Sequence, residues 1–148
     1  MNNSNGIKRD KDNFSEKYIE NIIFPLTEIL GCIDELEIFT SNLSRIEFFE
    51  NQDNVIGFVQ EYLIRISASL DVIKETKPMM WKWLLKKYEK IPWEKYIKIG
   101  KAIDKGYWAL IYSIAWKMAS IGVMDIKKVV IDLLELKSHK DQFDSEFI

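Results

Sequence analysis

Residues 107–124 read YWALIYSIAWKMASIGVM, and this run decides the fold class that the sequence predicts. Apart from the amphipathic tyrosines and tryptophans, its polar members are Ser113, Lys117 and Ser120. On a helix, with about 100° between successive residues, these three fall within roughly 60° of one another. The pattern predicts a central helix over residues 107–121 that is apolar on nearly every side and buried in a bundle, with one narrow polar strip.

The same run could instead cross a membrane, because its helix would span about 27 Å and a hydrocarbon core is about 30 Å thick. Against a span, Lys117 lies just past the middle, where a charge costs roughly 2.5 to 3.5 kcal/mol. The run is also rich in Ala, Ser and Gly. We therefore favour a buried core helix, in which Ile114→Ala should lower the free energy of unfolding by about 2 to 5 kcal/mol.

The length of 148 residues fits one domain with one core. Three prolines and six glycines provide little material for the many turns of an all-β fold. Apolar residues recur instead at helical spacing, most regularly from Ile56 to Ile73. We predict an all-α, single-domain bundle of about five to six helices over residues 14–137, with a mobile tail at 1–13 and a polar tail at 138–148.

Proline and glycine indicate where these helices should end. Pro25 should end or kink the first helix, because an interior proline removes a backbone hydrogen bond. Pro78 should stop the helix that precedes it, and Pro92 should begin another. A turn is expected after Gly122, with Asp125 capping the last helix.

Charge is unevenly distributed along the chain, although the net charge is only −2. Residues 1–73 carry 13 acidic against 6 basic side chains, whereas residues 74–105 carry 10 lysines against 4 acidic side chains. Residues 106–148 are close to neutral, with 5 basic and 6 acidic side chains. Such a distribution is either matched within the molecule or presented to a partner, and the sequence leaves both interpretations open.

Two charged surfaces are therefore candidate binding sites. The first is a lysine-rich set on the outer sides of two predicted helices: Lys82, Trp83, Lys86, Lys87, Lys90, Lys95, Lys98, Lys101 and Lys105. The second is an acidic alternative on an earlier helix: Asp34, Glu35 and Glu37. We expect one of these surfaces to bind a protein partner.

The sequence offers little for catalysis or metal binding. Its single histidine, His139, and single cysteine, Cys32, exclude an intramolecular disulfide and the common zinc sites. Ser113 and Lys117 lie one helical turn apart, but no oxyanion-hole turn accompanies them, and we interpret Lys117 as reaching solvent. We assign no catalytic residue, metal or cofactor and expect a non-enzymatic protein.

These observations predict a small binding protein of the inhibitor, immunity or antitoxin type. The alternatives are a peripheral membrane-surface module that uses the Trp/Lys-rich segment 78–105, or a weak nucleic-acid binder. The latter is disfavoured because only 3 of the 21 basic residues are arginines and the net charge is negative. A single cysteine and the lack of a signal peptide favour the cytoplasm, and the lysine- and isoleucine-rich composition favours a bacterial or phage-like source. The partner and the oligomeric state stay open.

Overall fold

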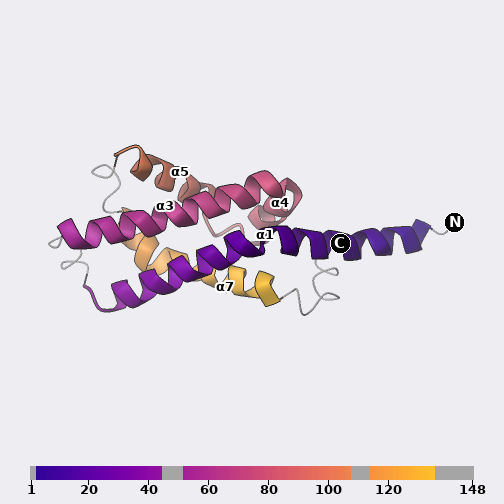
Figure 1. Ribbon diagram of the computed structural model, residues 1–148, viewed down its shortest axis with the longest axis horizontal. Coiled ribbons are helices and arrows are strands. Elements are labelled where there is room, and N and C mark those ends of the chain that lie inside the picture. The colour runs from indigo at the N-terminus through magenta and orange to yellow at the C-terminus, as the bar shows by residue number, and fades with distance from the viewer. Residues whose placement is uncertain (1–2, 45–51, 108–113, 136–148) are drawn as a thin grey trace.

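The computed structural model describes the backbone of residues 3–44, 52–107 and 114–135, and the side chains within 21–44, 57–107 and 114–135. In these ranges the chain forms five α-helices and one π-helical segment, and no strand (Figure 1). The elements are α1 (Asn3–Ser41), α3 (Gln52–Thr76), α4 (Pro78–Lys87), α5 (Trp93–Asp104), η1 (Met118–Gly122) and α7 (Val123–Glu135). The prediction of an all-α, single-domain helical bundle is confirmed.

Of the two expected effects of Pro25, an end of the helix is excluded, because α1 continues through this proline, and a kink stays a prediction. Ile22, Leu26 and Ile29 lie next to it along the helix and are fully buried. Each such side chain contributes roughly 1.5 to 3 kcal/mol when buried, whereas an interior proline costs about 3 kcal/mol. Packing on both sides of Pro25 therefore outweighs the lost hydrogen bond.

The first part of α1 is longer than the sequence suggested. The helix begins at Asn3, so residues 3–13, expected to be a tail, have a helical backbone. In Figure 1 this end of α1 projects past the other elements of the bundle. The mobility of residues 1–13 stays a prediction, and the C-terminal tail at 138–148 lies outside the described residues.

Helix α3 lies between α1 and α5, and α7 packs against α1 (Figure 1). The buried apolar side chains of α3 recur at steps of three and four residues: Val59, Leu63, Ile66, Leu70 and Ile73. The helix ends at Thr76, just before Pro78, as predicted. These contacts make α3 the element on which α1, α4 and α5 pack, whereas α7 packs on α1.

Helices α3 and α5 approach each other closely where Gly100 meets Ser67. A Cβ atom added at Gly100 would overlap the Cβ atom of Ser67. The Ser67 hydroxyl donates a hydrogen bond of 2.8 Å to the carbonyl oxygen of Ile97 on α5, which satisfies this buried polar group. A glycine at position 100 is therefore required for this spacing.

The end of α5 is a Schellman motif centred on Gly106. This glycine has a φ of +90°, a conformation that other residues rarely adopt. The Tyr107 N–H donates to the carbonyl of Ala102, and the Gly106 N–H donates to that of Ile103, each at 2.9 Å. The two bonds pair carbonyls that the end of the helix would otherwise leave free.

The expected turn after Gly122 is absent, and the helix continues across this position. Residues 114–117 are α-helical, η1 follows as a π-helical segment, and α7 begins directly at Val123. Asp125 consequently lies within the first turn of α7 and does not precede it as a cap. A Cβ atom at Gly122 would overlap the hydroxyl oxygen of Tyr96, so this glycine serves close packing against α5.

The described part of the predicted central helix is not buried on every side. Ala115, Met118 and Ala119 are buried, whereas Ile114 is 38% and Ile121 is 64% exposed. An apolar sequence therefore does not give all-round burial over residues 114–121, and the cost expected for Ile114→Ala is too high. Residues 108–113 lie outside the described ranges. Within those ranges, no helix has the length and apolar character to cross a membrane.

Candidate functional site

All eight lysines of the first candidate set are exposed, as predicted. They lie on α4, in the turn that follows it, on α5 and at the C-terminal cap of α5: Lys82, Lys86, Lys87, Lys90, Lys95, Lys98, Lys101 and Lys105. Trp83, the ninth member, is half-buried. We call these nine residues the lysine-rich surface.

Beneath the lysine-rich surface, two tryptophans connect α4 and α5. The rings of Trp81 and Trp93 meet edge to face with 6.0 Å between their centroids, and only 3% and 2% of these residues are exposed. The indole N–H of Trp81 donates to Glu94 Oε1 at 3.0 Å, and that of Trp93 donates to the carbonyl of Tyr88 at 3.2 Å. The rings and the indole N–H groups of both tryptophans therefore take part in packing and hydrogen bonds inside the fold.

Glu94 joins this connection to α3. Its Oε2 atom accepts a hydrogen bond of 3.1 Å from Lys74 Nζ. The hydrogen bond from Trp81, reinforced by Lys74, lowers the pKa of Glu94. One carboxylate thus connects three helices, and it holds α4 and α5 in a fixed relation below their lysines.

Several lysines of the surface have partners. Lys101 forms an ion pair of 3.4 Å with Asp71 on α3. Lys87 Nζ lies 5.1 Å from the ring centroid of Trp83 and 5.6 Å from that of Tyr88, and burial lowers the pKa of Lys87. Among the described residues no carboxylate forms an ion pair with five others: Lys82, Lys86, Lys90, Lys95 and Lys105.

Two of the three carboxylates in the acidic alternative already form ion pairs with a lysine of the same chain. Lys127 on α7 lies 3.0 Å from Asp34 and 2.8 Å from Glu37, and Glu35 is exposed. The hydrogen bonds to Glu37 and Asp34 raise the pKa of Lys127. Lys127 was not identified from the sequence, because it lies 90 residues from Glu37 and carries no local signal.

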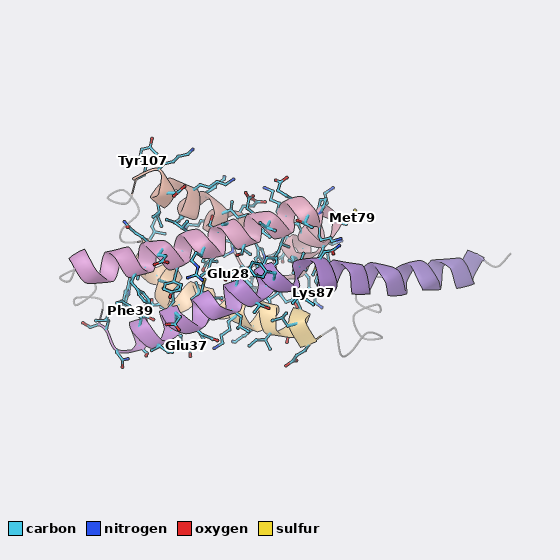
Figure 2. All side chains as sticks on the ribbon, viewed as in Figure 1. Glu28, Glu37, Phe39, Met79, Lys87 and Tyr107 are labelled. Carbon is cyan, nitrogen blue, oxygen red and sulfur yellow. The ribbon has the colours of Figure 1, made fainter. Side chains whose placement is uncertain are left out.

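A second ion pair within the chain joins α1 to α3. Arg65 donates to Glu28 through Nε at 2.6 Å and forms an ion pair with the same carboxylate, while Glu61 lies 3.9 Å away. Figure 2 shows Glu28 between these two helices. The acidic side chains of α1 are thus partly neutralised by bases on α3 and α7.

The structure adds a groove that the sequence did not reveal. It has a volume of about 430 Å³ and lies between α7 and the end of α4 with its following turn. Buried Val129 and half-buried Tyr88 and Ile91 provide its apolar floor. Its exposed rim carries three lysines and three carboxylates: Lys87, Lys90, Lys128, Glu89, Asp125 and Asp132. Lys87 and Lys90 belong to both the groove and the lysine-rich surface.

The groove lies at one end of the bundle. Figure 2 shows Lys87 and Met79 together at this end, whereas Tyr107 and Phe39 lie at the opposite end. Burial and the charge of Asp132 raise the pKa of Tyr88. This phenol is therefore neutral at physiological pH, and its ring provides an uncharged wall.

Other chemistry is not assembled in the described ranges. No three His, Cys, Asp or Glu side chains there could hold a metal ion together. Cys32 is buried, and burial raises the pKa of its thiol to about 12, which opposes formation of the reactive thiolate. Ser113 and His139 lie outside the described residues.

Comparison with known proteins gives no further assignment. No protein family, curated protein or solved structure matches the chain.

Proposed function

We propose that the protein is a non-enzymatic binding domain of the inhibitor, immunity or antitoxin type, and that its lysine-rich surface contacts a partner protein. The observation that carries this proposal is the set of exposed lysines on α4, α5 and the turn between them that form no ion pair with a described carboxylate. A rigid base of Trp81, Trp93 and Glu94 supports that set. A fixed surface of one charge accelerates association with a partner of the opposite charge.

The lysine-rich surface is a better candidate than the acidic one. Asp34 and Glu37 are already bound by Lys127, so a cationic partner would have to compete with an internal lysine. Lys95 on α5 and Lys105 at the C-terminal cap of that helix face no such competition from the described carboxylates. The partner is therefore expected to present acidic groups.

A membrane surface is a weaker interpretation. Membrane-surface modules insert aromatic side chains at the interface, but Trp81 and Trp93 are buried and hydrogen-bonded inside the bundle. Trp83 alone would remain from the tryptophans of segment 78–105, and it packs against Tyr88.

Nucleic acid is disfavoured for a related reason. Single-strand binders stack bases on exposed aromatic rings, and α5 directs Trp93 and Tyr96 into the core. Arginine, the residue that most often reads base edges, is scarce. A cytoplasmic location in a bacterial or phage-like source belongs to this proposal and follows from composition.

The test compares charge reversals on two surfaces. Lys95→Glu and Lys105→Glu are made singly and together, and Lys117→Glu is the control because Lys117 is exposed on a different helix. The wild-type protein is used to isolate partners from an extract of the native host, and each purified partner is titrated against every variant. The double reversal should weaken binding at least about tenfold, which corresponds to roughly 1.4 kcal/mol, whereas the control should leave it unchanged.

Two results would contradict the proposal. In one, the partner binds the double reversal as well as it binds wild type but loses affinity for Lys117→Glu. In the other, no partner is retained and the purified protein turns over a substrate.

A further inference from the structure

The groove beside Lys87 and Lys90 suggests how a partner is held. Its rim is balanced between three lysines and three carboxylates, so it attracts neither an anion nor a cation by net charge. Its floor is apolar, and its volume of about 430 Å³ is that of a ligand pocket. The group that fits such a floor is uncharged and apolar.

The lysines outside the groove would attract acidic residues of the partner. Lys86 lies near the end of α4, four residues before Lys90 in the following turn, and Lys95 begins the exposed lysines of α5 on the other side of that turn. Lysines therefore precede and follow the segment that lines the groove. A protein interface commonly places an apolar anchor in a pocket and surrounds it with polar contacts.

We infer that the groove between the Tyr88–Ile91 turn and α7 receives an apolar side chain of the partner, while acidic residues of the same partner segment contact the lysines on either side. This inference rests on the proposed function. Lys87 is already held against Trp83 and Tyr88, so one wall of the groove is ordered before the partner arrives. Such preorganisation reduces the entropy lost on binding.

The probes are short synthetic peptides rich in glutamate, identical except at one central position. That position is Leu, Phe or Met in the test peptides and Ser in the control peptide. Each peptide carries a fluorophore and is titrated with the full chain at about 50 mM salt, where charge attraction is strong. An apolar central residue should tighten binding at least about tenfold relative to Ser.

Two variants of α7 locate the binding site. Asp132→Phe places a ring at the rim of the groove, and Glu135→Phe makes the same change at an exposed position that does not line it. Asp132→Phe should remove the advantage of the apolar peptides, and Glu135→Phe should preserve it. Should Asp132→Phe fail to fold, methyl NMR of wild type replaces it. The apolar peptides should then shift the methyl signals of Ile91 and the Ser peptide should not.

The outcomes separate this inference from the proposed function. If the Leu and Ser peptides bind equally and both are weakened by Lys95→Glu with Lys105→Glu, the anchor is wrong and the lysine-rich surface still binds acidic protein. If no peptide binds, the anchor is overturned, and the host partner with its charge reversals decides the function separately. Binding to anionic vesicles or to duplex DNA in place of every peptide would overturn both.

Discussion

At the scale of single residues, two glycines determine how closely helices approach. Gly100 allows α5 to approach Ser67 on α3, and Gly122 makes room for the hydroxyl of Tyr96. Neither glycine lies in a turn, so the usual interpretation of glycine as a helix terminator fails at both positions. Gly31 and Gly57 differ from them because each faces open space.

Replacement of Gly100 tests this distinction. Gly100→Ala should destabilise the protein by about 1 to 3 kcal/mol, because the added methyl overlaps Ser67 and forces the two helices apart. Gly31→Ala is the matched control and should stabilise by roughly 0.5 to 1 kcal/mol, since alanine is the better helix former. Urea unfolding of both variants measures the change. Equal effects of the two substitutions would show that the α3–α5 contact is not tight.

The carboxylate of Glu94 gives a prediction about pH. Its folded-state pKa lies below the ordinary value of 4.5, so its contribution to stability is present above pH 4.5 and is lost as the pH falls through the folded pKa. Glu94→Gln should therefore destabilise the protein at about pH 7, and the difference in stability from wild type should shrink progressively as the pH falls below about 4.5. Urea midpoints measured across this range decide the matter. Glu75→Gln, at an exposed position, is the control and should show no such convergence.

At the scale of elements, the π-helical segment η1 replaces the turn that the sequence suggested. A π-helical turn contains more residues than an α-helical one, so it changes the direction of the side chains that follow. After it, Val123, Ile126, Val129, Val130 and Leu133 of α7 are buried. Tyr96 of α5 packs against Gly122 at the end of this segment, so a contact from another helix accompanies the irregular turn.

A double-mutant cycle tests the contact between Tyr96 and Gly122. Gly122→Ala should destabilise the wild-type protein, because the new methyl overlaps the tyrosine hydroxyl. In a Tyr96→Phe background the nearest remaining ring atom is 3.4 Å away, an ordinary contact, so the same substitution should cost much less. The coupling free energy should lie between about 0.5 and 3 kcal/mol in thermal or urea unfolding. Additive effects would mean that the hydroxyl does not occupy this space.

At the scale of the whole molecule, one core connects elements that are far apart in sequence. Buried residues of α1, α3, α4, α5 and α7 belong to a single hydrophobic cluster. Ion pairs connect the same elements at the surface, with Arg65 joining α3 to α1 and Lys127 joining α7 to α1. Such pairs are partly exposed and contribute little each, so the common core provides most of the cohesion.

The single core predicts cooperative unfolding. Ile29→Ala on α1 removes a fully buried side chain and should lower the free energy of unfolding by about 2 to 5 kcal/mol. All five tryptophans lie within residues 81–116, so fluorescence reports on a different part of the chain. The fluorescence and circular dichroism midpoints should fall together, because one unit unfolds. A fluorescence midpoint that stays unchanged, while that from circular dichroism falls, would show two independent units. Thr27→Ala, at an exposed position, is the control.

The sequence by itself determined the fold class and most of the helices, because local spacing of apolar residues fixes which side of a helix is buried. The stripe from Val59 to Ile73 followed directly from that spacing. The exposed positions of the candidate lysines followed for the same reason. The end of α3 before Pro78 was equally predictable, since proline restricts the backbone of the residue that precedes it.

Only the tertiary structure decided which charges and surfaces remain available. The pairing of Lys127 with Asp34 and Glu37 depends on the packing of α7 against α1, and residues so far apart give no sequence signal. The groove depends in the same way on where α7 passes the end of α4. The exposure of Ile114 and Ile121 was also undetermined, because an apolar run is buried only where other helices cover it. Long-range packing, which no local sequence pattern encodes, determines which charges are paired and which surfaces are exposed.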